Sequence, residues 1–339
     1  MTVAGTLRVI DFGTAAPLRS QTYWHAVAYG VSAGAAPTLS FVQPSAPYVS
    51  IGYHRRLEEV DRATCTTNGW PVYRRMIGGG PVYLDKGQLF FQITMPMRSI
   101  PAARHRALRR LLGPAIEAFR AVGIPAVLDE HLEIVVDDRK ICGYGAGQIG
   151  ESAIVAGNLI LDFDHRAAAS ILRAPSATAD AELARLIGRY VAATPADTAA
   201  FKAAATDAYC RDLQLSPRDG VLNPIERDRL DELDQRFCSA SWLAGSSRPD
   251  PDVWQAKIRA GVWMFAARDG DTELVVCVDN GRVLRARLQH PHLNGSRSSI
   301  ETELAGLTLA EAATTLGRSG DPGTELADLF TRADPGRSL

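Results

Sequence analysis

The sequence predicts a mixed α+β protein with two domains, and three observations support this prediction. The chain has 339 residues, enough for one large or two ordinary domains. Residues 7–100 consist mostly of short apolar runs separated by turn residues, whereas residues 165–213 have helical spacing. Residues 214–224 interrupt the pattern with proline, glycine and asparagine, so we expect a domain at 1–213, a linker at 214–224 and a second domain at 225–339.

The first hundred residues are expected to form strands, with one helix near 21–31. Residues 47–53 are apolar and bounded by turn residues, which indicates a buried strand. Residues 57–69 have helical spacing and end at a glycine. Further strands are expected at 71–74 and at 88–96, where a proline ends the second.

A basic amphipathic helix is expected at 103–122, and its arginines form either a solvated face or a docking face for an acidic partner. Strands follow at 133–136 and 158–162, and the glycine-rich segment 143–150 between them indicates a hairpin or bulge. Three helices are then expected, at about 165–173, 178–192 and 195–213.

The second domain is expected to be a smaller α/β unit. It begins with a helix at about 226–241. Three strands are expected after it, at 261–267, 273–279 and 283–288. Residues 279–282 are a strong hairpin turn signal between two of these strands. Two helices are expected to close the chain, at about 299–305 and 308–318.

Composition and charge exclude several classes of protein. A hydrophobic content of 46% argues against disorder, and a net charge of −1 leaves no electrostatic footprint for nucleic acid. No apolar run has the roughly 18–20 residues of a membrane helix, and the N-terminus lacks the pattern of a signal peptide. The five cysteines form no CxxC pair and the seven histidines have no metal-ligand spacing. We therefore expect a cytoplasmic monomer without a disulfide framework or a zinc site.

Residues 74–85 are the most informative segment for function. Gly78, Gly79 and Gly80 give a backbone without Cβ atoms, which can approach a ligand closely and direct N–H groups at an anion. Arg75 and the arginine before it could bind a phosphate or carboxylate with forked hydrogen bonds. The segment therefore predicts a pocket for an anionic small molecule, and a glycine-rich hairpin with two surface arginines is the alternative.

Four segments in this order resemble one known family. They are a strand with a glycine at 49–53, the pattern RRxxGGGxVYxDxG at 74–87, residues 138–143 with Lys140, and residues 157–161. The arrangement resembles the lipoate–protein ligase A and octanoyltransferase superfamily, which shares its fold with biotin–protein ligase. The resemblance covers about residues 30–175, and residues 225–335 are more weakly similar to the accessory C-terminal domain of complete lipoate ligases. It implies a catalytic domain of mixed sheets flanked by helices, followed by a smaller α/β domain.

The resemblance implies an ATP-dependent lipoate–protein ligase. Such an enzyme activates lipoate or octanoate with ATP and Mg²⁺ to an acyl-AMP. It then transfers the acyl group to a lysine of a lipoyl-domain protein, such as a glycine-cleavage H-protein or a 2-oxoacid dehydrogenase lipoyl domain. No nucleic acid or membrane partner is implied.

The resemblance also implies roles for individual residues. Lys140 is the implied catalytic residue, an electrophilic clamp between the acyl carbonyl and the phosphate. The implied binding residues for substrate and adenylate flank the glycines and the lysine: Arg75, Gly78, Gly79, Gly80, Val82, Tyr83, Asp85, Lys140, Gly143 and Gly157. Glu133 could supply a carboxylate for magnesium.

The chain departs from the family pattern at several polar positions. Leu84 stands where family members usually have histidine, and Ile77 stands where they have serine or threonine. Leu132 and Glu133 replace an Asn-Asp pair. A His-Gly-Thr triplet is also replaced, by Ala156, Gly157 and Asn158. These changes favour a shifted substrate preference or a specialised branch of the family.

Two other functions stay open. An ATP-independent octanoyl or lipoyl transferase would need a cysteine nucleophile. The two places where such transferases carry it correspond to 127–131 and 151–156, which contain no cysteine, so Cys142 beside Lys140 is the remaining candidate. A non-catalytic lipoyl-domain binding protein is the third possibility, against which Arg75 and Lys140 argue.

Overall fold

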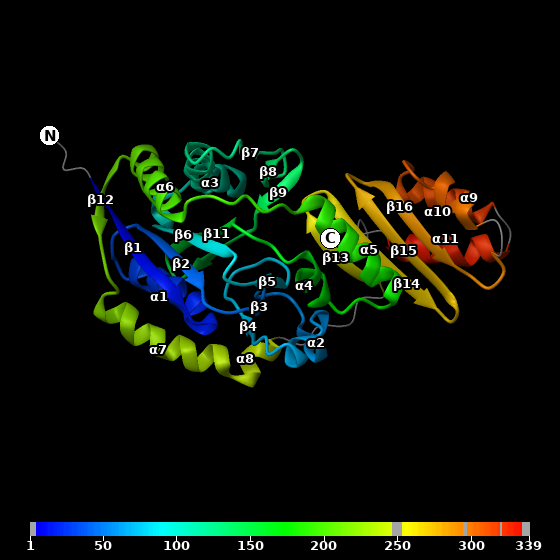
Figure 1. Cartoon of the computed structure of the whole chain (residues 1–339), viewed down its shortest axis with the longest axis horizontal. Helices are drawn as coiled ribbons and strands as arrows, with labels where there is room; N and C mark the ends of the chain where they lie inside the picture. The colour runs from blue at the N-terminus through cyan, green and yellow to red at the C-terminus, as the bar shows by residue number, and fades with distance from the viewer. Residues whose placement is uncertain (1–4, 246–252, 294–296, 319–320, 334–339) are drawn as a thin grey trace. The chain divides into compact units, whose positions relative to one another are not determined.

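The protein consists of two compact units, each with helices and strands, which confirms the predicted α+β class (Figure 1). The computed structural model describes residues 5–245, 253–293, 297–318 and 321–333. The first unit comprises Met1–Leu172 and Val191–Ser247, and the second comprises Arg173–Tyr190 and Arg248–Leu339.

A six-stranded mixed sheet forms the centre of the first unit. Its strands, in order across the sheet, are β10 (Tyr144–Ile149), β11 (Ser152–Ile160), β6 (Gln88–Pro96), β2 (Thr38–Pro44), β1 (Gly5–Ala15) and β12 (Leu215–Asp219). β1 pairs in parallel with both of its neighbours, and the other pairings are antiparallel. Every residue of β6 is buried, as expected for a central strand covered on both faces.

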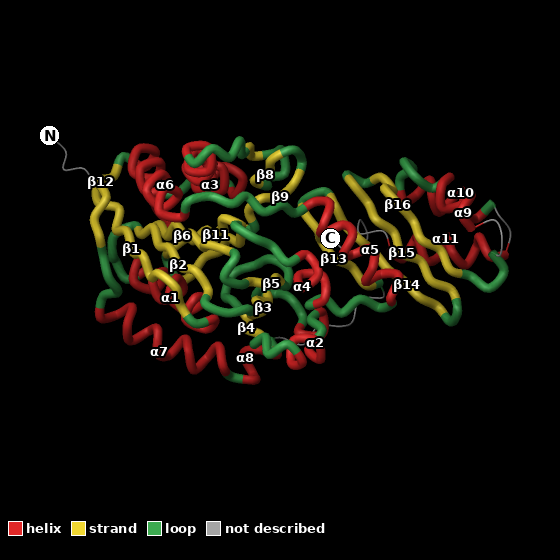
Figure 2. The backbone as a smooth tube through the Cα atoms, in the orientation of Figure 1, coloured by secondary structure: helices red, strands yellow, loops and turns green. Residues whose placement is uncertain are grey.

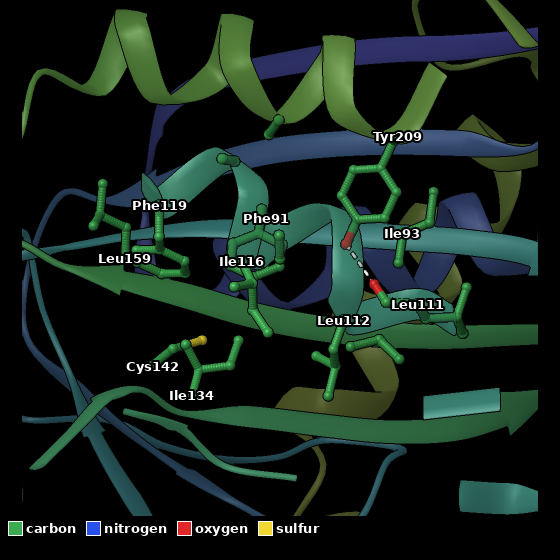
Figure 3. Packing of buried hydrophobic residues seen from close by; sticks show 14 of the residues in the cluster. Phe91, Ile93, Leu111, Leu112, Ile116, Phe119, Ile134, Cys142, Leu159 and Tyr209 are labelled. Carbon is green, nitrogen blue, oxygen red and sulfur yellow. Dashed lines mark hydrogen bonds between the residues drawn. The ribbon is translucent and has the colours of Figure 1, made fainter. Parts of the chain in front are cut away.

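Helices cover both faces of this sheet, and in Figure 1 α3 and α6 lie above it while α1 and α7 lie below. Their bounds are α1 (Pro17–Ser32), α3 (Arg104–Ala121), α6 (Thr198–Leu213) and α7 (Pro224–Cys238). Because side chains alternate along a strand, Phe91 and Ile93 of β6 face the core under α3 and α6. In that core the hydroxyl of Tyr209 donates a 2.7 Å hydrogen bond to the carbonyl oxygen of Leu111 (Figure 3).

Two small sheets carry the segments that the sequence singled out. One contains β4 (Val72–Arg74), β3 (Tyr48–Ile51) and β5 (Val82–Leu84), and the triple glycine joins β4 to β5. The other contains β7 (Val127–Leu128), β8 (Ile134–Val136) and β9 (Arg139–Cys142), and β9 carries Lys140. Short helices complete the unit: η1 (Leu57–Glu59), α2 (Arg62–Thr67), η2 (Met97–Ser99), α4 (His165–Ser170) and α8 (Ala240–Ala244).

The second unit is built on an antiparallel sheet, drawn in yellow in Figure 2. Its strands are β13 (Trp254–Arg259), β14 (Val262–Asp269), β15 (Thr272–Asp279) and β16 (Arg282–Gln289). Its helices are α5 (Ala177–Tyr190), α9 (Arg297–Glu303), α10 (Leu309–Gly317) and α11 (Asp321–Ala333). Ala286 and Leu288 of β16 join a core with α10 and α11. Arg285 and Arg287, which alternate with them, bind Glu182 of α5.

The boundaries between these two units do not coincide with the predicted linker. Residues 215–219 of that linker form the edge strand β12, parallel to β1. The helix α7, predicted in the second domain, packs on α1 in the first unit, where Leu230, Leu233 and Phe237 share a cluster with Ala26. The predicted helix at 178–192 is α5, which belongs to the second unit. Turn residues mark a loop, but they do not show which core the following helix joins.

Most predicted elements are present, with shifted bounds. The predicted helix at 57–69 is a short 3₁₀ turn followed by α2, and the glycine-rich segment 143–150 contains the regular strand β10. β13 and α11 were not predicted. Among the described residues, no helix has the length and apolar character needed to span a membrane.

Candidate active site

The buried side chain of Arg75 binds backbone carbonyl groups of the triple-glycine loop. Its guanidinium donates hydrogen bonds to the carbonyl oxygens of Gly78 (2.9 Å), Gly80 (2.9 Å) and Ser50 (2.8 Å). Burial lowers the pKa of Arg75 to about 10, so the group still carries its charge at neutral pH. The cation therefore shapes the loop by binding its carbonyl groups.

Because Arg75 binds the carbonyl groups of the loop, the backbone N–H groups of the loop remain available to a ligand. Within the described part of the chain, the N–H groups of Gly78, Gly79 and Gly80 have no hydrogen-bond acceptor. Gly79 and Gly80 are exposed, so a ligand can reach these donors. Unpaired N–H groups beside a buried cation can bind an anion such as a phosphate, so the geometry is compatible with the predicted cradle, which stays a prediction.

Glycine is required at two positions of this cradle. Gly79 has φ +104°, and a Cβ atom there would lie 2.5 Å from Nη2 of Arg75. A Cβ atom on Gly52, in the loop after β3, would lie 1.9 Å from the carbonyl oxygen of Gly79. Both distances are shorter than a real Cβ atom allows, so the strand–loop packing depends on these two glycines.

Arg74 is also bound to backbone oxygens. Its side chain is almost fully buried and donates hydrogen bonds to six carbonyl groups, those of Gly52, Tyr53, Arg55, Trp242, Leu243 and Ala244. Both arginines therefore organise the backbone around the cradle in this structure. Direct contact of Arg75 with a ligand stays a prediction.

Lys140 forms an ion pair with Glu133, with 2.7 Å between Nζ and Oε2. The lysine side chain is 20% exposed, whereas the carboxylate is buried. A tight turn places Glu133, since the carboxylate of Asp129 accepts hydrogen bonds from the N–H groups of His131 and Glu133. Leu132 in this turn has φ +64°, a left-handed conformation that asparagine adopts more readily than leucine. Leu132, which stands where the family usually has asparagine, therefore has a strained backbone conformation.

A chain of buried hydrogen bonds connects the lysine segment to the cradle. The N–H of Gly143 donates to Oδ1 of Asn158 (2.7 Å), and Nδ2 of Asn158 donates to Oε1 of Gln88 (2.7 Å). Nε2 of Gln88 then donates to the carbonyl oxygen of Tyr83 in β5 (3.3 Å). Asn158 and Gln88 thus bring together two segments that are about sixty residues apart in the sequence. The only sequence signal for this role was the unusual asparagine at 158.

Packing brings the same two segments together. A Cβ atom on Gly145 of β10 would lie 2.7 Å from the side chain of Ile77, which precedes the glycines. One on Gly157 would lie 2.5 Å from the ring of Phe91. These glycines therefore serve close packing, which assigns Gly157 a structural role beside the predicted binding role.

The remaining predicted residues lie along β5 and its turn. Val82 is 39% exposed, and Tyr83 is buried, with a pKa raised by burial and by nearby Asp85. The carboxylate of Asp85 accepts a 2.8 Å hydrogen bond from the N–H of Gly87. Leu84, where the family usually has histidine, packs in an apolar cluster with Tyr48 and Phe90.

Cys142 does not have the properties of a nucleophile. Its side chain is fully buried in the core under α3 (Figure 3). Burial raises the pKa of its thiol to about 12, although Lys140 nearby acts in the opposite direction. A thiol with this pKa is protonated at neutral pH and out of reach of a substrate.

The magnesium prediction rests on Glu133 alone. Among the described residues, no group of three or more His, Cys, Asp or Glu side chains could hold a metal ion. The carboxylate of Glu133 is also bound to Lys140. The residues present therefore do not fit a resident metal site, and Glu133 as a magnesium ligand stays a prediction.

Comparison with known proteins identifies the class. A model of the lipoyl protein ligase A/B catalytic domain matches residues 20–193, just over half of the chain. The chain therefore belongs to this family, as the sequence motifs predicted. It is an enzyme of the lipoate ligase and octanoyltransferase group.

Individual relatives include both activities of the group. Octanoyltransferase LipM of Moorella thermoacetica is 24% identical over 271 residues, which cover 71% of this chain and 98% of the relative. Lipoate-protein ligase LplJ of Bacillus subtilis is 34% identical over 98 residues, 29% of each chain. A bipartite lipoate protein ligase from Thermoplasma acidophilum has the same fold, with a TM-score of 0.65, 22% identity, and coverage of 73% of this chain and 99% of its own. These similarities confirm the predicted fold and leave ligase and transferase activity to be distinguished.

Proposed function

We propose that the protein is an ATP-dependent lipoate–protein ligase, which forms an acyl-AMP from lipoate or octanoate and passes the acyl group to a lysine of a lipoyl-domain protein. The burial of Cys142 is the observation that carries this proposal. A transferase of this family would need a reactive thiol, and residues 127–131 and 151–156, where such transferases carry it, contain no cysteine. The remaining candidate, Cys142, is fully buried, and the pKa of its thiol is about 12.

The cradle and Lys140 suit the first half-reaction. There, a carboxylate oxygen of the acyl substrate attacks the α-phosphorus of ATP, and the bond to the departing pyrophosphate breaks. The N–H groups of Gly78, Gly79 and Gly80 are free to bind phosphate oxygens, and Arg75 beneath them adds positive potential. Magnesium would enter with ATP, because it binds phosphates with only one or two carboxylates.

Lys140 would serve both half-reactions. Its ammonium group forms an ion pair with Glu133 in this structure. Lys140 lies near the start of the segment that the hydrogen bonds of Asn158 connect to the cradle. It can bind the acyl carbonyl oxygen and a phosphate oxygen together, which stabilises charge that develops on both. In the second half-reaction the amine of the acceptor lysine attacks this carbonyl carbon, loses a proton and displaces AMP.

A mass measurement on the acceptor tests the proposal. We expect a lipoyl-domain protein to gain the mass of a lipoyl group only when ATP, Mg²⁺ and lipoate are present. Lys140→Ala should lower the rate about a hundredfold or more, because a charged donor to the reacting oxygens is lost. Lys202→Ala is the matched control, since Lys202 forms a similar 2.8 Å ion pair with Asp11 on α6 and β1.

The transferase alternative has a distinct outcome. The match to the Moorella octanoyltransferase covers almost all of that protein, so octanoyl-carrier protein should be tested as a donor. Acyl transfer from this donor without ATP, abolished by Cys142→Ala, would overturn the ligase proposal. We expect Cys142→Ala to leave ATP-dependent transfer within about twofold of the parent protein, because such a small core change removes only a sulfur atom.

A further inference from the structure

Helix α1 contributes a buried histidine to the base of the cradle, which the sequence did not predict. Nε2 of His25 lies 3.0 Å from the backbone N of Met76, and Nδ1 lies 2.6 Å from the carbonyl oxygen of Gln21. The Met76 N–H is a donor, so Nε2 must accept, and the ring proton must be on Nδ1. His25 therefore acts as a neutral acceptor for the residue that follows Arg75.

A second contact from α1 is connected to Arg75 through Ser50. The side-chain oxygen of Gln21, one helical turn before His25, accepts a hydrogen bond from the hydroxyl of Ser50 (3.1 Å). Ser50 in turn accepts from Arg75, with 2.8 Å between Nη1 and the Ser50 carbonyl oxygen. α1 thus holds Met76 directly and Arg75 through Ser50, shortly before the three glycines.

Packing keeps the His25 ring in one orientation. Trp24 stacks on it with 3.5 Å between ring centroids, and Phe237 packs against it in a T-shaped arrangement with 4.9 Å between centroids. Burial, with Arg75 and Arg236 as further causes, lowers the pKa of His25 to about 3, so the ring is neutral at physiological pH. The hydrogen bond to Met76 is therefore available throughout the working range of the protein.

We propose that His25 is a positioning residue for acyl-AMP formation: by accepting from Met76 it fixes the backbone that presents the Gly78, Gly79 and Gly80 N–H groups to phosphate. This inference rests on the proposed function for its kinetic consequence, but its structural part is independent of that function. Loss of the acceptor leaves the part-buried Met76 N–H unpaired, which favours other conformations of the loop.

Two substitutions separate the hydrogen bond from the packing. His25→Phe keeps an aromatic ring between Trp24 and Phe237 but removes the acceptor. His25→Gln removes the ring but can place its side-chain oxygen where Nε2 lies, because both atoms are at the ε position. Phe237→Leu is the packing control, since it changes the neighbour of the ring and leaves the hydrogen bond intact.

Hydrogen–deuterium exchange of the Met76 amide and the kinetics of acyl-AMP formation provide the readouts. For His25→Phe we expect about tenfold faster exchange of this amide, because its acceptor is lost, and about tenfold higher KM for ATP. His25→Gln should recover most of both effects, and Phe237→Leu should lower the melting temperature without changing the exchange of the Met76 amide.

Exchange unchanged in His25→Phe, or equal effects of His25→Phe and His25→Gln, would overturn the inference. If His25→Phe does not fold, the comparison of His25→Gln with the parent protein decides, because retained exchange protection of the Met76 amide requires a working acceptor. The exchange measurement does not depend on activity. A protein that shows the exchange pattern but forms no acyl-AMP would contradict the proposed function and leave the positioning role standing.

Discussion

At the scale of single residues, Arg74 and Arg75 show how backbone carbonyl groups can hold buried positive charges. Both guanidinium groups donate to carbonyl oxygens, and among the described residues neither forms an ion pair. Hydrogen bonds to many carbonyl dipoles reduce the cost of burying such charges. Because no ion pair neutralises these charges within the described residues, we expect them to raise the local affinity for an anion at the glycine loop.

His25 predicts a pH dependence of stability at the same scale. Its pKa is about 3 in the folded protein against 6.5 when exposed, so only the unfolded chain takes up a proton between these values. Stability from this group is complete above pH 6.5 and is lost as the pH falls toward 3. Between pH 7 and pH 5 we expect a loss of about 2 kcal/mol in the free energy of unfolding, measured by urea denaturation.

The matched comparison uses histidines in different environments. His25→Gln should reduce the difference between pH 7 and pH 5, because it removes the titrating group. His105→Gln should leave the difference unchanged, since His105 is exposed on α3. An unchanged pH difference in His25→Gln would contradict the buried neutral histidine.

At the scale of elements, local patterns were predictable and long-range pairings were not. Residues 71–74 and 88–96 were predicted as strands because apolar residues and a proline define them locally. The three glycines were predicted as an anion cradle because a backbone without Cβ atoms can approach a ligand closely. Asn158 and His25 could not be predicted as parts of the site, because their partners, Gln88 and Met76, lie far along the chain.

Glu182 on α5 shows the same limit for the second unit. Its carboxylate is buried and lies 2.8 Å from Nε of Arg185, 3.1 Å from Nε of Arg285 and 3.4 Å from Nε of Arg287. Removing its charge leaves the neighbouring guanidinium groups of Arg285 and Arg287 without the carboxylate charge that both bind. We expect Glu182→Gln to lower the free energy of unfolding of the second unit by about 2 kcal/mol, since the arginines are partly exposed.

Chemical denaturation monitored by hydrogen exchange in β16 measures this effect. Glu117→Gln is the control, because Glu117 pairs with Arg211 at an exposed position and should change stability by less than about 0.5 kcal/mol. Equal stability of Glu182→Gln and the parent protein would show that α5 is held by apolar packing alone.

At the scale of the whole molecule, neither unit is a continuous part of the chain. The first unit is interrupted by α5, which belongs to the second, and resumes at Val191. It ends only after α8, whose last carbonyl groups bind Arg74 beside the cradle. The predicted boundary at 213 therefore cuts through the first unit.

Two truncations test this organisation. A chain ending at Leu213 lacks β12, α7 and α8, and thereby leaves Arg8 without Glu226 and Arg74 without half of its acceptors. We expect it not to fold, because buried charged donors without partners cost several kcal/mol each. A chain ending at Ser247 keeps these contacts and should retain the cooperative unfolding of the first unit.

The longer truncation should nevertheless associate, because it keeps α5 without the sheet that this helix contacts. α5 buries Leu183, Leu186 and Ile187 in the intact protein, and these side chains would then face water. Replacing all three with serine should restore a monodisperse protein in light scattering and leave its melting temperature within about 2 °C, since surface changes alter stability little. A soluble monomer before this replacement, or a folded protein from the chain ending at Leu213, would contradict the assignment of α5 and α7 to their units.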